Sequence, residues 1–190
     1  MSHPVIATNL SVEEFAVYDV PDWLRGELVR GELQVTPGPG AAHGAVTTIL
    51  GTRLHIYVEA RKLGRVLINC SFELVQLPRT VRVPDVAFVR MDRLPADGIE
   101  PGFMRVPPDL AVEIISPSET RARLGEKLDD YRAVAIPLVW LIDPRKRTVT
   151  VIEGDLPAQQ LGEGDALAGG TVIPGFRCEI RDLFEGLART

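Results

Sequence analysis

Two acidic residues and one lysine occupy positions that could support chemistry. Asp85 follows Pro84 in the β-rich run "RVPDVAFV", and Glu113 lies 28 residues later in "DLAVEIISPS". The neighbours of Glu113 are apolar at successive positions, as in a strand covered on both faces. An unpaired carboxylate there costs roughly several kcal/mol unless it is neutralised, hydrogen-bonded or bound to a metal. Glu113 therefore needs a partner.

A divalent cation and a buried Arg or Lys, Lys127 in particular, are the candidates for that partner. Carboxylates on neighbouring strands can hold Mg²⁺ or Mn²⁺, which prefer oxygen ligands and keep several waters. Lys127, on the helix predicted after the Glu113 strand, could then position an attacking water and counter charge on a phosphate. Alternatively, Lys127 forms a structural ion pair with Glu113, and no metal is needed.

Strands and helices in a mixed order must bring these residues together. Ser11 and Glu14 form a capping-box pattern for a short helix, and Arg30-Gly31 fits the turn of a hairpin. Apolar residues from 46 to 58 recur at helical spacing, with Gly64 as the expected stop, and Ser118 is the expected cap of the helix that carries Lys127. The predicted fold class is α/β, or mixed α+β, with a mixed sheet flanked by helices. The further predicted strands are "RVLINCSFELVQL", "VRVPDVAFV", "PLVWLID" and "TVTVIEG".

The length and composition of the chain fit one globular domain over residues 1–190, with 1–36 as an N-terminal helix and hairpin segment. Hydrophobic residues make up 45%, which argues against a disordered chain, and the net charge of -5 counts mildly against a protein that binds many phosphates through its surface. Two cysteines are too few for a disulfide framework or a zinc site. We expect a cytoplasmic location, because no signal-peptide pattern or membrane-length apolar run is present.

The order of several segments resembles the Uma-type (Uma two) endonuclease family, within the PD-(D/E)XK restriction-endonuclease-like superfamily. The resemblance covers roughly residues 24 to 153, and its segments are "ELVRGELQVTPGP", "AAHG", "VRVPDVAFV", "PPDLAVEIISPSET", "EKLDDY" and "PLVWLIDPRKRTVTV". It implies a restriction-endonuclease-like core, a mixed β-sheet flanked by helices, with a divalent-metal site in a cleft. The partner it implies is nucleic acid, with DNA as the first expectation.

The resemblance also implies residue roles. Asp85 and Glu113 would be ligands for Mg²⁺ or Mn²⁺, and the backbone carbonyl of Ile114 would be a third ligand. Lys127 would be the catalytic lysine, and Glu27 would be a glutamate that closes the site from the other side. Two positions depart from the pattern. Ile115 stands where the superfamily's lysine usually lies, so the lysine must come from the helix, and Arg123 stands where the family often has an acid.

Other polar residues have simpler interpretations. His43 is expected to be a helix-entry cap or surface residue rather than a ligand, and Asp109 to be structural near the start of its strand. Tyr131, one helical turn after Lys127, is expected to pack on the lysine stem. Ser116 lacks the histidine–acid pattern of a serine nucleophile. The basic turn "PRKR" fits a solvated hairpin tip.

The first hypothesis is thus a Mg²⁺-dependent phosphodiesterase, an endonuclease acting on nucleic acid. The second is a catalytically inactive relative that serves as a binding or oligomerisation module, with Lys127 paired to Glu113. The acidic total and Arg123 favour the second hypothesis. A hydrolase of a small phosphate compound is a third interpretation that sequence does not separate from the first. A homodimer is expected because two-fold homo-oligomers are common.

Overall fold

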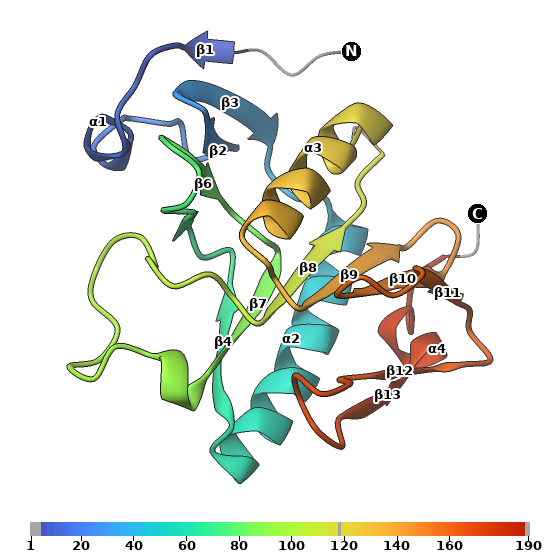
Figure 1. Cartoon of the computed structure of the whole chain (residues 1–190). Helices are drawn as coiled ribbons and strands as arrows, with labels where there is room; N and C mark the ends of the chain where they lie inside the picture. Colours follow the sequence, from blue (N-terminus) through green and yellow to red (C-terminus); the bar gives the residue numbers. More distant parts are fainter. Residues whose placement is uncertain (1–4, 118, 189–190) are drawn as a thin grey trace.

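A six-stranded mixed sheet forms the centre of the chain (Figure 1). The computed structural model describes residues 5–117 and 119–188. Strand β8 pairs parallel with β9 and antiparallel with β7, and the remaining neighbours are antiparallel. In sheet order the strands are β11 (Gln159–Leu161), β10 (Thr148–Glu153), β9 (Leu138–Asp143), β8 (Leu110–Ile114), β7 (Val86–Arg90) and β4 (Gly64–Ile68).

Helices cover both faces of this sheet (Figure 1). Side chains along each strand alternate between the faces, so each face presents apolar residues that a helix buries. Val86 and Phe88 of β7 share one hydrophobic cluster with the apolar stripe of α2 (Ala41–Arg61) and with α4 (Ile180–Leu183). Ala87 and Val89 belong to a second cluster on the opposite face, beneath α3 (Arg121–Ala133). The predicted class, a mixed sheet flanked by helices, is therefore confirmed.

A second sheet of five strands is built mainly from the N-terminal segment. The capping box of Ser11 and Glu14 opens the short helix α1 (Val12–Ala16), as predicted. Arg30 and Gly31 both have positive φ angles and form the turn of the β2–β3 hairpin. In sheet order the strands are β1 (Val5–Ala7), β3 (Glu32–Pro37), β2 (Leu24–Val29), β6 (Val81–Arg82) and β5 (Phe72–Glu73).

The run "VRVPDVAFV" is divided between the two sheets. Strand β6 ends at Arg82 and β7 begins at Val86, so Pro84 and Asp85 lie at the crossing from one sheet to the other. Proline has no N–H for a ladder hydrogen bond, which accounts for the interruption at this point. The crossing places the Asp85 side chain between the sheets.

The C-terminal region and two helix boundaries complete the fold. Strands β12 (Ala166–Ala168) and β13 (Arg177–Glu179) form a small antiparallel sheet, and η1 (Met91–Arg93) follows β7. Helix α2 ends with Lys62 in the left-handed conformation rather than at Gly64, and α3 is capped by Thr120. Ser118, the predicted cap, lies outside the described residues. In residues 5–117 and 119–188, no helix combines the length and apolarity needed to cross a membrane.

Candidate active site

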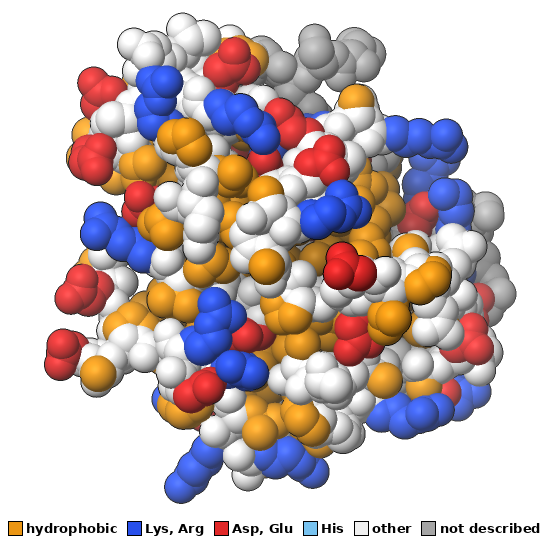
Figure 2. Space-filling view, viewed as in Figure 1, with side chains coloured by type: hydrophobic (Ala, Val, Ile, Leu, Met, Phe, Trp, Pro, Cys, Tyr) orange, Lys and Arg blue, Asp and Glu red, His pale blue; other side chains and the backbone are white. Residues whose placement is uncertain are grey.

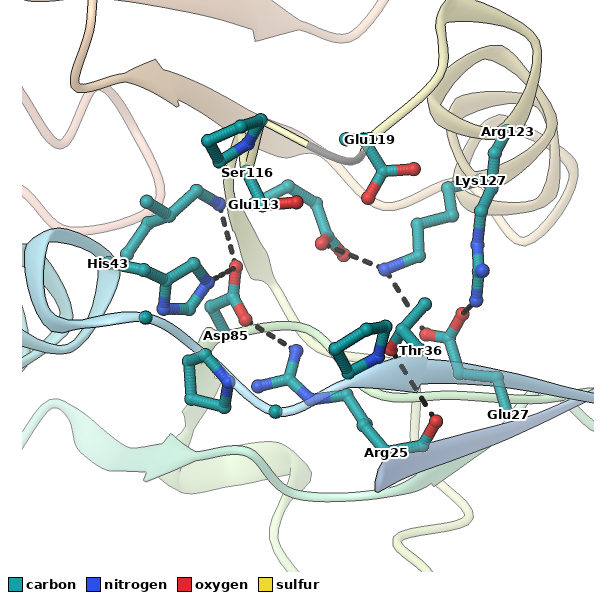
Figure 3. Close-up of a pocket in the computed structure, with 16 residues that line it drawn as sticks. Arg25, Glu27, Thr36, His43, Asp85, Glu113, Ser116, Glu119, Arg123 and Lys127 are labelled. Carbon is teal, nitrogen blue, oxygen red and sulfur yellow. Dashed lines mark hydrogen bonds and ion pairs between the residues drawn. The ribbon is translucent and has the colours of Figure 1, made fainter. Parts of the chain in front are cut away.

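One cleft between the two sheets receives the predicted side chains Glu27, Asp85, Glu113 and Lys127 (Figure 3). Its walls come from β2, the end of β3, the loop and first turn of α2, the residue before β7, the end of β8 with the loop after it, and the first turns of α3. The four side chains come from segments far apart in sequence, and each is at most 5% exposed. The spacing argument therefore identified residues that the fold brings together.

Glu113 lies on β8, as predicted, whereas Asp85 lies directly before the neighbouring strand β7 rather than within it. Val86 pairs with Val112 across the β7–β8 ladder, and the Asp85 N–H donates to the Val112 carbonyl at 2.9 Å. On the Asp85 carboxylate, Oδ2 accepts the Ile114 N–H at 2.7 Å, and Oδ1 accepts from Arg25 Nη1 at 2.6 Å. Burial raises the Asp85 pKa, but hydrogen bonding from His43 and the Arg25 charge lower it, and the net pKa lies below the ordinary value. Asp85 is thus held as a carboxylate.

Glu113 has the opposite electrostatic character. Burial is the main reason why its pKa rises to about 7, and the charges of Asp85 and Glu27 raise it further. The Lys127 ammonium, at 2.9 Å, and the Tyr131 hydroxyl, which donates to Glu113 Oε1, act against this rise in pKa. The cleft therefore leaves the Glu113 carboxylate incompletely compensated, which is the condition that a bound cation relieves.

Lys127 lies between two glutamates. Its Nζ is 2.9 Å from Glu113 Oε2 and 3.2 Å from Glu27 Oε1. Burial alone lowers the pKa of Lys127, but these two carboxylates reverse that effect and raise the pKa above its usual value. The ammonium therefore stays protonated at neutral pH, so it can donate hydrogen bonds and counter negative charge but cannot serve as a base.

Glu27 connects the cleft to a buried structural network. It accepts the Val83 N–H at 2.9 Å and lies 3.2 Å from Arg82 Nη1 and 3.3 Å from Arg123 Nη2. Arg82, in turn, donates through Nε and Nη2 to Asp130 Oδ2 at 2.8 and 2.6 Å. Burial raises the Glu27 pKa, but the surrounding cations lower it well below the ordinary range. Glu27 is thus permanently ionised and anchors Lys127.

The other polar candidates are placed as follows. His43 lies in the first turn of α2, as expected, but its side chain is 11% exposed and its Nε2 is 3.0 Å from Asp85 Oδ2. It is a cleft residue rather than a surface one.

Asp109 accepts from the Arg90 N–H and from Arg93 Nη1, which agrees with a structural role. Tyr131 does more than pack, because its hydroxyl bonds Glu113.

Two residues that reasoning from sequence missed also line the cleft. Arg25 precedes Glu27 by two positions on β2, and the period-two alternation of a strand could have indicated that both side chains share a face. Glu119 gave no comparable signal. Its Oε1 is buried without a hydrogen-bond partner in the part of the chain that the structure describes, and so are Nε and Nη1 of Arg123.

The residues present fit a hard divalent cation by donor type. Asp85 and Glu113 supply carboxylate oxygens, and Ile114 lines the same cleft. The buried Glu119 Oε1, which accepts no hydrogen bond from the described residues, is a further oxygen in the cleft. Within residues 5–117 and 119–188, no cluster of three or more His, Cys, Asp or Glu side chains is arranged to hold a metal. A cation here would therefore have two carboxylate ligands, with backbone oxygen and water completing its shell.

Comparisons with known proteins agree with this architecture. The model of the Uma2 family, described as "Putative restriction endonuclease", matches residues 12–181. The fold is similar to that of a "putative nuclease belonging to DUF820" from Anabaena variabilis, with a TM-score of 0.79 and 20% identity over 92% of this chain and 97% of that one. No curated protein matches the chain.

Proposed function

The chain belongs to the Uma2 family, and we propose that it is a metal-dependent endonuclease of the PD-(D/E)XK type that hydrolyses phosphodiester bonds in nucleic acid, with DNA as the first substrate to test. The observation that carries the proposal is the convergence of Asp85, Glu113, Lys127 and Glu27 on one cleft. Two carboxylates beside a protonated lysine suit phosphoryl transfer, where the negative charge on the phosphate must be countered.

Each residue has a distinct role in the proposed mechanism. Mg²⁺ or Mn²⁺ would be held by Asp85, Glu113 and the Ile114 carbonyl. Such a cation would stabilise negative charge on a phosphoryl oxygen and lower the pKa of a bound water. Lys127, fixed by Glu27 at 3.2 Å, donates hydrogen bonds to the attacking water or to the phosphate. Because Lys127 keeps its proton, it orients and stabilises rather than accepting a proton.

The surface supports recognition inside the cleft rather than over a broad area. Figure 2 shows Lys and Arg side chains interspersed with Asp and Glu on the face that it presents. With a net charge of -5, the chain has little general attraction for polyanions. Binding of a phosphodiester would therefore depend on charges inside the cleft, and it would weaken only modestly with added salt.

Cleavage assays test the proposal. The wild-type protein is incubated with single- and double-stranded DNA and RNA in Mg²⁺, in Mn²⁺ and with EDTA. Asp85→Asn, Glu113→Gln and Lys127→Met are assayed beside it, with Lys146→Met, a change in a side chain that is 72% exposed on the β9–β10 turn, as the matched control. We expect metal-dependent cleavage that all three cleft substitutions abolish and the control retains. Equal cleavage by the cleft variants would refute the assignment.

A second candidate function is a binding or oligomerisation module without turnover. The pairing of Lys127 with Glu113 at 2.9 Å and of Arg25 with Asp85 at 2.6 Å favours it, because each carboxylate already has a cationic partner without a metal. Thermal unfolding separates the two functions. A metal site is stabilised by Mn²⁺ through mass action, by about 2.7 kcal/mol at a free concentration of roughly 100 Kd, whereas a self-compensated module gains nothing.

A further inference from the structure

The two carboxylate oxygens of Asp85 differ in whether their hydrogen-bond donors can move away. Oδ2 accepts the Ile114 N–H at 2.7 Å and lies 3.0 Å from His43 Nε2. The Ile114 donor belongs to the β8 main chain and cannot leave without breaking the strand. Oδ1 contacts Arg25 Nη1 at 2.6 Å. Oδ1 is therefore the oxygen that can be offered to a cation, and a guanidinium occupies it (Figure 3).

Arg25 reaches Asp85 from the other sheet. It belongs to β2, its side chain is 19% exposed, and its second terminal nitrogen, Nη2, donates to Asn69 Oδ1. Asn69 is itself tied to Asp85, because its N–H donates to the Asp85 carbonyl at 3.2 Å. The guanidinium thus spans two adjoining acceptors, and the Asn69 side chain helps to hold it beside the Asp85 carboxylate.

We propose that Arg25 acts as an internal substitute for the metal, so that a divalent cation binds Asp85 only by displacing the Arg25 guanidinium from Oδ1. This inference rests on the proposed metal-dependent function and adds a residue that sets the affinity of the site. A guanidinium and a divalent cation repel each other at contact distance, and they compete for the same oxygen. The Kd measured for the cation then includes the free-energy cost of displacing the Arg25 guanidinium from Asp85 Oδ1.

Displacement also gives Arg25 a second position in the cleft. The planar guanidinium matches the oxygens of a phosphate, and Arg25 lines the same cleft as Lys127. Once free of Asp85, the side chain is available to a phosphodiester beside the metal. The exchange therefore links arrival of the cation to exposure of a phosphate-binding group.

The test is a calorimetric titration of Mn²⁺ into the wild-type protein, Arg25→Gln and Arg30→Gln. Arg30 is the matched control, because its loss changes net charge equally while it contacts Glu126 and Asp130 rather than Asp85. Removing a charged hydrogen bond that competes with the metal should tighten Mn²⁺ binding by about tenfold or more in Arg25→Gln. Arg30→Gln should keep the wild-type affinity.

A second variant protects the test against a folding defect. Asn69→Gly removes the other anchor of Arg25, and glycine tolerates the φ of 49° at this position. It should also tighten Mn²⁺ binding, by a smaller factor than Arg25→Gln. Thermal unfolding gives an independent readout: without metal Arg25→Gln should melt below wild type, and saturating Mn²⁺ should close that gap.

The outcomes separate this inference from the proposed function. Saturable Mn²⁺ binding with the same Kd in wild type, Arg25→Gln and Asn69→Gly overturns the exchange and leaves the metal site standing. Equal tightening in Arg25→Gln and Arg30→Gln also overturns it, because the effect would then be one of overall charge. No binding by any variant overturns the metal site and the exchange together.

Discussion

Lys127 Nζ lies 2.9 Å from Glu113 Oε2, within a cleft where both side chains are almost fully buried. Glu27, 3.2 Å away, holds the same ammonium from the opposite side. The lysine is thus oriented by two glutamates. The acid that Arg123 replaces is therefore not needed for that purpose, and the departure at this position does not by itself disable the site.

Lys127→Met should destabilise the protein and abolish cleavage. Without the ammonium, Glu27 and Glu113 remain buried with one cation fewer, and breaking a buried ion pair in this way costs about 3–5 kcal/mol. Urea unfolding measures the free energy. Lys146→Met, which removes an exposed charge, should change it by less than about 0.5 kcal/mol. A loss in Lys127→Met as small as that in Lys146→Met would contradict the stabilising role of the buried pair.

Glu113 should make the metal-free protein less stable as pH rises. Its pKa is about 7 in the folded state against an ordinary value of 4.5, so the folded protein binds this proton more tightly than the unfolded chain. The resulting stabilisation is complete below the ordinary value and is lost as pH rises through about 7. Glu113→Gln cannot ionise, so its free energy of unfolding should decline less between about pH 5 and pH 8. Parallel pH profiles for the two proteins would contradict this assignment.

Arg82 should matter for folding and not for metal binding. It is 0% exposed and donates twice to Asp130, and this contact joins β6 to α3. Arg82→Met should therefore lower the free energy of unfolding by about 3–5 kcal/mol. Its Mn²⁺ affinity, measured well below the melting temperature, should stay within about twofold of wild type, because Arg82 contacts Glu27 and Asp130 rather than Asp85 or Glu113. A selective loss of Mn²⁺ affinity, with stability unchanged, would place Arg82 in the site instead.

The sequence predicted the acids better than their partners. Asp85 and Glu113 were identifiable because carboxylates in apolar, β-rich runs require compensation, and that requirement is local. Arg25, Asn69 and His43 reach the site through pairing between distant strands and packing of α2, which no short pattern encodes. Sequence spacing therefore locates the groups that need compensation, whereas tertiary structure decides what compensates them.

Element boundaries show the same division. The capping box at Ser11 and the turn at Arg30-Gly31 are local signals, and both were predicted correctly. The crossing at Pro84 looked like part of one strand, because apolar residues continue on both sides of it. Only the assembled structure shows that the run serves two sheets, and this division is what carries Asp85 into the cleft.

The most direct test of the central proposal is a calorimetric Mn²⁺ titration of the wild-type protein beside Asp85→Asn and Glu113→Gln. Circular dichroism verifies that each variant is folded. We predict saturable binding by the wild type that is lost in both variants, because each removes one of the two proposed carboxylate ligands. Undiminished Mn²⁺ affinity in the two folded variants would contradict a metal site formed by Asp85 and Glu113.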